Sequence, residues 1–135
     1  MIFLDIGFIF ALVSTADAQH ERVVEVLREF RDATIITTNY VVAETITLSR
    51  RLGHSHAVNI GDQLYKQELA AIHWATPDEE WTAFEYFKRY EDKRYSFVDC
   101  LSFIVMEKLD IREALTVDSD FTHRFIAYPG PLRPS

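Results

Sequence analysis

The chain has 135 residues, of which 48% are hydrophobic, enough to bury one core and too few for two. Its 14 Lys and Arg against 21 Asp and Glu give a net charge of −7, which excludes a protein that holds nucleic acid by bulk positive charge. The chain has one cysteine, Cys100, which excludes an internal disulfide and a thiolate zinc site and favours a cytoplasmic protein. No apolar stretch reaches the ~20 residues that a membrane-spanning helix needs.

The first half of the chain predicts two strands, each followed by helical sequence. Residues 1–4 are apolar and predict a short buried strand that ends at Asp5, with Gly7 marking a turn. The elements that follow are an amphipathic helix over 17–31 that Asp17 can cap, a strand over 33–37, and a helix over 40–52 that stops at Gly53.

The second half continues the alternation. Thr76 and Ser96 are hydroxyl residues at the predicted starts of two helices, each with an acid three positions later. The predicted elements are a helix over 55–69, a strand over 71–75, a helix over 77–90, a charged loop over 91–95, a helix over 97–109, a strand over 113–117 and a fifth strand over 125–128.

Strands that alternate with helices predict a parallel sheet, because parallel strands need crossover connections. We therefore expect an α/β fold, a three-layer α/β/α sandwich with a central parallel sheet of four to five strands, formed by residues 1–135 as a single domain. In such folds ligands bind outside the carboxyl ends of the strands, so that edge of the sheet is the predicted site.

Four acidic residues are expected at this edge. Asp5 follows the first strand and Asp118 follows the fourth. Glu44 lies about one turn into the helix after the second strand, and Asp99 lies in the first turn of the helix that leads into the fourth strand. Both helices must begin at the carboxyl edge, so the topology predicts that the four carboxylates converge.

Each acid also has a structural interpretation. Asp99 can form a capping box with Ser96, Asp118 can cap the turn that follows it, and Asp5 can close a turn. Glu44 stands within an apolar helical segment, so we expect its carboxylate to be buried and to require a cation.

Carboxylates that gather at one place repel one another unless a cation compensates them. Ligation by oxygen alone selects hard divalent ions, so Mg²⁺ or Mn²⁺ is the expected cofactor. Zinc is disfavoured because the histidines do not accompany the acids in the sequence; they are His20, His54, His56, His73 and His123.

Four segments carry a resemblance to a known family. They are Asp5–Leu12 (DIGFIFAL), Thr38–Glu44 (TNYVVAE), Tyr95–Leu101 (YSFVDCL) and Leu115–Phe121 (LTVDSDF). In this order and at these separations they resemble the acidic motifs of PIN-domain ribonucleases, and the resemblance covers essentially the whole chain. The size of the chain is similar to that of VapC-type toxins of toxin-antitoxin pairs.

The resemblance implies a metal-dependent endonuclease that hydrolyses RNA phosphodiesters, with Asp5, Glu44, Asp99 and Asp118 as catalytic and metal-binding residues and Asp120 as an accessory. It also implies the toxin of a type II toxin-antitoxin module, which forms a homodimer and binds a small antitoxin protein.

Local basic residues offer contacts to RNA phosphates despite the acidic net charge. Arg50, Lys93 and Arg94 are the candidates, although such residues are commonly solvated surface charges.

Two other functions stay open. A PIN-fold module that binds metal or a partner without turnover is one, because Ile6 replaces the Thr or Ser that usually follows the first Asp of the family. A Mg²⁺-dependent phosphatase of the haloacid dehalogenase type is the other, but it needs a second Asp two positions after the first, where this chain has Gly7.

Overall fold

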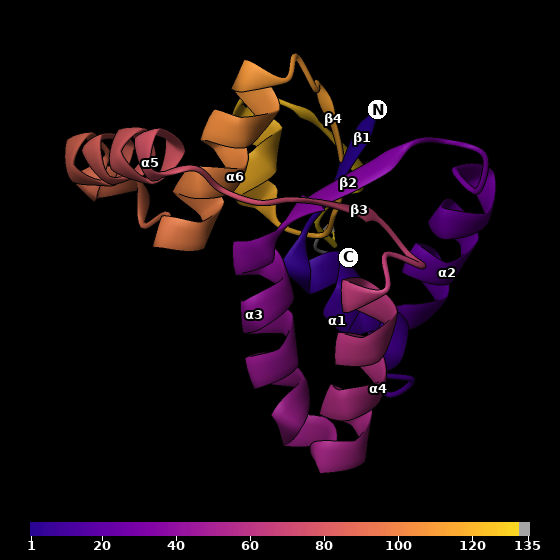
Figure 1. Cartoon of the computed structure of the whole chain (residues 1–135). Helices are drawn as coiled ribbons and strands as arrows, with labels where there is room; N and C mark the ends of the chain where they lie inside the picture. The colour runs from indigo at the N-terminus through magenta and orange to yellow at the C-terminus, as the bar shows by residue number, and fades with distance from the viewer. Residues whose placement is uncertain (133–135) are drawn as a thin grey trace.

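The computed structural model describes residues 1–132, so the last three residues of the predicted domain lie outside the described part (Figure 1). The elements in chain order, with η for 3-10 helices, are β1 (Ile2–Leu4), α1 (Ile6–Val13), α2 (His20–Glu29), β2 (Ile35–Thr38), α3 (Asn39–Ser49), η1 (Arg50–Leu52), α4 (His54–Tyr65), β3 (Ala71–His73), α5 (Pro77–Arg89), η2 (Glu91–Lys93), α6 (Phe97–Lys108), β4 (Glu113–Thr116), η3 (Ser119–His123) and β5 (Ile126–Pro129).

The five strands form one parallel sheet in the order β3-β2-β1-β4-β5. The predicted α/β class and parallel sheet are confirmed, including the fifth strand. The first strand lies at the centre, where Phe3 and Leu4 are fully buried, because it is covered on both faces and paired on both edges. The carboxyl ends of β1 and β4 are therefore neighbours.

The turn predicted at Gly7 is wrong: α1 begins directly after Asp5. Its sequence is apolar on every side, so it lacks the periodicity by which a surface helix is recognised. Phe8, Ile9 and Ala11 are buried by the surrounding elements. Gly7 serves close packing, since a Cβ there would lie 3.0 Å from Cγ2 of Val117.

Other helix boundaries shift by a few residues. The second helix starts at His20, and Asp17 accepts a hydrogen bond from the Gln19 N–H at 2.8 Å ahead of it. The helix predicted over 40–52 ends at Ser49 and continues as a 3-10 turn to Leu52. Within residues 1–132 no helix combines the length and the hydropathy needed to cross a bilayer.

A buried carboxylate, Glu79, joins three elements at the opposite end of α6 from Asp99. It completes the capping box with Thr76 at the start of α5 and accepts hydrogen bonds from Lys108 at 2.8 Å and, in β3, from His73 at 2.9 Å. Burial opposes its ionisation, but the hydrogen bonds from Lys108 and the Thr76 N–H lower the pKa of Glu79 to about 2. This ion pair fixes α5 and α6 against the edge of the sheet.

Candidate metal centre

Two of the predicted acids act as helix caps, as their sequence context suggested. The Asp99 N–H donates to Oγ of Ser96 at 3.0 Å, and Oδ2 of Asp99 accepts from the Ser96 N–H at 3.1 Å. Asp118 caps η3 by accepting the Asp120 N–H on Oδ1 at 2.9 Å. The caps fix where both carboxylates point.

Asp99 and Asp118 also belong to a cluster of three acids, the third of which is Asp120. Asp99, Asp118 and Asp120 each place a carboxylate oxygen within 4.8 Å of the others, which is close enough for one ion to contact all three. The Asp99 side chain is buried, whereas Asp118 and Asp120 are partly exposed, so the cluster opens to solvent on one side.

Asp5 is not a member of this three-acid cluster; it lies at the end of the central strand, is 1% exposed, and is near enough for the charges of Asp99 and Asp118 to act on it. Its Oδ2 accepts a hydrogen bond from Oγ1 of Thr116 at 2.9 Å, while its buried Oδ1 has no hydrogen-bond partner among residues 1–132. Oγ1 of Thr116 accepts the Asp118 N–H at 3.0 Å. One hydroxyl thus connects the first acid of the chain to the segment that carries Asp118 and Asp120.

Thr116 was not among the predicted site residues. The family pattern has a hydroxyl residue directly after the first Asp, where this chain has Ile6. In the structure the hydroxyl that contacts Asp5 comes from Thr116 of β4, 111 residues from Asp5 in the sequence. The signal available was a threonine at the end of a strand, two positions before a predicted site acid. The absence of a hydroxyl at position 6 therefore does not leave Asp5 without one.

Without a bound cation, ionisation of the carboxyl groups of Asp5 and Asp99 is unfavourable. Burial, and next the charge of Asp99, raise the pKa of Asp5 to about 7. Burial raises the pKa of Asp99 to about 6, with the charge of Asp118 adding to the rise against a hydrogen bond from Ser96. A divalent ion would remove both penalties and give Oδ1 of Asp5 a cation to bind, so the residues fit a site for a hard divalent ion.

The expectation of a buried Glu44 is wrong. The helix α3 buries Val41, Val42 and Thr45, which turns Ala43 and Glu44 outward to solvent. An almost uniformly apolar segment does not reveal which face of a helix packs inward. The Glu44 carboxylate is not part of the three-acid cluster within residues 1–132.

Glu44 nevertheless lies near the centre. It lines a shallow pocket with Ile6, the residue after Asp5, and with Arg51. Its position is at the rim of the predicted site rather than inside it.

The basic candidates divide into two groups. Lys93 and Arg94 directly precede the segment that starts α6 and carries Asp99. Arg50 follows the last residue of α3, whose 11 residues span roughly 16 Å at 1.5 Å per residue, so it lies at the end of α3 away from the sheet (Figure 1).

Comparison with known proteins agrees with this geometry. The chain matches the PIN domain family over residues 2–124. It is 37% identical over 123 residues to the 23S rRNA-specific endonuclease VapC20 of Mycobacterium tuberculosis, which covers 90% of this chain and 92% of that protein. The crystal structure of M. tuberculosis VapC20, described as a Sarcin-Ricin loop cleaving toxin, superimposes with a TM-score of 0.86 at 34% identity over 99% of this chain and 100% of the other.

A more distant structure, FitAcB from Neisseria gonorrhoeae, matches with a TM-score of 0.65 at 16% identity over 95% of this chain and 96% of the other, which shows a shared fold. The resemblance found in the sequence motifs is thus confirmed by the family match over nine tenths of the chain and by relatives at more than 30% identity. The chain belongs to the PIN-domain family and is a VapC-like member of it.

Proposed function

We propose that this protein is a Mg²⁺- or Mn²⁺-dependent endoribonuclease and the toxin of a type II toxin-antitoxin module. The observation that carries the proposal is the acidic centre. It consists of three aspartates with oxygens within 4.8 Å of one another, next to Asp5, whose buried Oδ1 has no hydrogen-bond partner in the described part of the chain. The endonuclease activity in the name of the 37% identical relative supports the same reaction class.

In this proposal Asp5, Asp99 and Asp118 are the metal ligands. Each uses one oxygen to accept a hydrogen bond from Thr116, Ser96 or Asp120, and this leaves the second oxygen for an ion. Asp120 is the accessory acid on the open side. A bound divalent ion supplies charge neutralisation at the phosphate and lowers the pKa of a coordinated water.

Glu44 keeps a place in the proposal as a rim residue. Its exposed carboxylate beside Ile6 faces solvent, where substrate enters, so we assign it to orienting the attacking water or the RNA rather than to holding the metal from within. Lys93 and Arg94, which precede the α6 cap, are proposed to contact RNA phosphates. Arg50 belongs to a surface farther from the centre.

The first substrate to test is the sarcin–ricin loop, because the 37% identical relative is named a 23S rRNA-specific endonuclease and its crystal structure is described as a Sarcin-Ricin loop cleaving toxin. A ribosomal RNA substrate would be met in the cytoplasm, which is the location we propose.

The test is cleavage of a synthetic RNA hairpin with that loop sequence, with Mg²⁺ or Mn²⁺ and with EDTA. We expect cutting only with the ion, and loss of at least 100-fold in rate for Asp99→Asn, which keeps a side-chain oxygen for the Ser96 N–H and so preserves the cap. Metal-independent cutting, or full activity of Asp99→Asn, would contradict the proposal. An inert wild type that binds Mn²⁺ would support the non-catalytic module instead.

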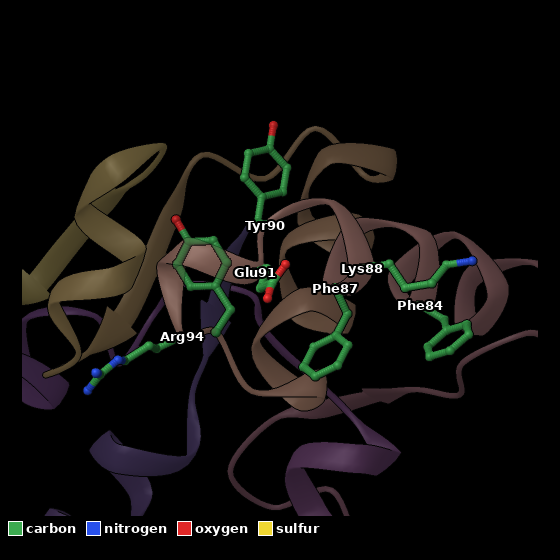
Figure 2. A pocket seen from close by; sticks show the side chains of 7 residues that line it. Phe84, Phe87, Lys88, Tyr90, Glu91 and Arg94 are labelled. Carbon is green, nitrogen blue, oxygen red and sulfur yellow. The ribbon is translucent and has the colours of Figure 1, made fainter.

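The proposed partners are a small antitoxin and a second copy of this chain. The outer face of α5 carries Trp81, Phe84 and Phe87, which are 60%, 41% and 42% exposed. Phe84 and Phe87 line a cavity of about 500 Å³ together with the charged side chains of Lys88 and Glu91 (Figure 2).

A surface with large apolar side chains and both signs of charge suits an isologous contact, in which each charge meets its opposite on a twofold-related copy. The exposed aromatic residues of α5 therefore support the homodimer, with the α5 face as its interface.

A further inference from the structure

Tyr95 and His123 form a hydrogen-bonded pair that the acidic motifs do not include. The Tyr95 hydroxyl lies 2.8 Å from Nδ1 of His123. The tyrosine is 7% exposed, and its ring packs edge-on against Phe103 with centroids 5.1 Å apart. The hydroxyl is therefore held in place by the core, whereas the imidazole is exposed at the surface.

The imidazole lies on the same side of η3 as an acid of the centre. Residues three apart in a 3-10 helix eclipse one another, and His123 follows Asp120 by three positions in η3. The pKa of Asp120 reports the same proximity: burial and the charge of Asp118 raise it, and His123 opposes the rise. His123 thus borders the three-acid cluster.

The pair also connects the two segments that bring the acids together. Tyr95 directly precedes Ser96, the cap that holds Asp99, while His123 ends the 3-10 helix that Asp118 caps. A contact at Nδ1 fixes the plane of the imidazole and leaves Nε2 free, since the side chain makes no other hydrogen bond within residues 1–132.

Binding of an RNA phosphate at the acidic centre would require a hydrogen-bond donor beside the carboxylates. Its side chains are carboxylates, an RNA phosphate is also an anion, and the whole chain carries a net charge of −7. A divalent ion held by the aspartates would offset part of this repulsion, and an oriented N–H beside the cluster would offset more by donating to a nonbridging phosphate oxygen.

We infer that His123 is a substrate-contacting residue whose Nε2–H donates to an RNA phosphate at the acidic centre, and that Tyr95 is the positioning residue that orients it. With the tyrosine hydroxyl donating to Nδ1, the imidazole hydrogen lies on Nε2, as this role requires. The inference rests on the proposed function, because it names the contact by which that same site holds its RNA.

The test compares His123→Ala, His123→Gln and Tyr95→Phe with wild type on the sarcin–ricin hairpin, measuring kcat, KM and Mn²⁺ affinity separately. Gln keeps an N–H near the position of Nε2, and Phe keeps the ring that packs on Phe103. His56→Ala, at an exposed histidine in the first turn of α4, is the matched control.

We expect His123→Ala to raise KM about 10- to 100-fold, as loss of a charge-assisted hydrogen bond does, with Mn²⁺ affinity unchanged. His123→Gln should recover most of the loss, and Tyr95→Phe should raise KM several-fold. His56→Ala should behave as wild type. Wild-type kinetics for His123→Ala, or a loss of Mn²⁺ affinity that accounts for its defect, would overturn the inference.

A second readout separates this inference from the proposed function. Binding of the labelled hairpin to Asp99→Asn, followed by fluorescence anisotropy, should weaken about 10-fold when His123→Ala is added. If wild type does not cut RNA, the proposed function fails, and this binding difference still decides the role of His123. If wild type cuts RNA and the binding difference is absent, the inference alone is overturned.

Discussion

At the scale of single residues, the same side chains have a structural role and a proposed role in metal binding. Asp99 and Asp118 are caps, and they are also members of the acidic cluster. The two interpretations that the sequence left open for these acids are therefore compatible, because a carboxylate has two oxygens and the caps use one.

Asp5 should destabilise the metal-free protein at neutral pH. Its pKa is about 7 in the fold against an ordinary value of 3.8, so the folded state holds its proton more tightly than the unfolded chain does. The stability contributed by this group is full below about pH 4 and is lost as pH rises through 7.

We expect Asp5→Asn to be more stable than wild type by roughly 2–4 kcal/mol at pH 8 in EDTA, at about 1.4 kcal/mol per pKa unit, and the gain to shrink by pH 5. Urea unfolding of both proteins at the two pH values measures this difference and cancels all other titrating groups. A pH-independent difference would argue against the burial of an ionised Asp5.

Thr116 should matter for metal affinity, although it contributes no ligand. Thr116→Val keeps the side-chain shape and removes the hydroxyl that contacts Asp5 and the Asp118 N–H. Loss of such a supporting contact typically lowers metal affinity 10- to 100-fold, and we expect about this loss for Mn²⁺ by calorimetry. Thr82→Val, at an exposed hydroxyl on α5, should leave the affinity unchanged. Equal affinities for the two variants would refute the role of Thr116.

At the scale of elements, local signals were sufficient where the structure is decided locally. The capping boxes at Thr76 and Ser96 depend on residues three apart, and both were predictable from the sequence. Strand and helix direction alone predicted that Asp99 and Asp118 meet at the sheet edge where β1 ends, whereas the third member of the cluster is Asp120 and not Asp5 or Glu44.

What depended on tertiary packing was not predictable. The sequence of α1 is apolar throughout and has no helical periodicity of polar and apolar residues. The sequence of α3 does not indicate which face of the helix packs inward, and the hydrogen bond of Thr116 to Asp5 joins side chains 111 residues apart. Sequence reasoning therefore located the acids along the fold but misjudged the exposure of Glu44.

The ion pair between Glu79 of α5 and Lys108 of α6 predicts a pH-dependent contribution to stability. Because the pKa of Glu79 is lowered to about 2, its charge stabilises the fold at and above about pH 4.5, and this stabilisation is lost as pH falls toward 2. We expect Glu79→Gln to cost about 1–3 kcal/mol at pH 7, from unpairing a buried hydrogen-bonded group, and much less near pH 2. Urea unfolding checks this, with the exposed Glu85→Gln as the control. A cost that stays constant with pH would contradict it.

At the scale of the whole molecule, the proposed function reconciles an acidic net charge with an RNA substrate through local contacts. Cations beside the start of α6, an imidazole beside Asp120 and a divalent ion between the aspartates would bind phosphate at the point of cleavage, so no basic surface is required.

The exposed aromatic face of α5 predicts a homodimer with this face as its interface. Phe87→Glu places a charge within the exposed aromatic surface and should convert a dimer to a monomer, because an unpaired charge would be buried in the interface. Val58→Glu, at an exposed apolar residue of α4, should remain dimeric. Light scattering coupled to size-exclusion chromatography measures both, and a monomeric wild type at micromolar concentration would exclude this interface.

The central claim is that acids from distant parts of the chain share one divalent ion, and anomalous diffraction from crystals soaked in Mn²⁺ tests it most directly. We predict one strong peak about 2.0–2.4 Å from carboxylate oxygens of Asp5, Asp99 and Asp118, and its loss in Asp99→Asn. A peak at other residues, or Mn²⁺-soaked crystals with no peak between these aspartates, would contradict the account.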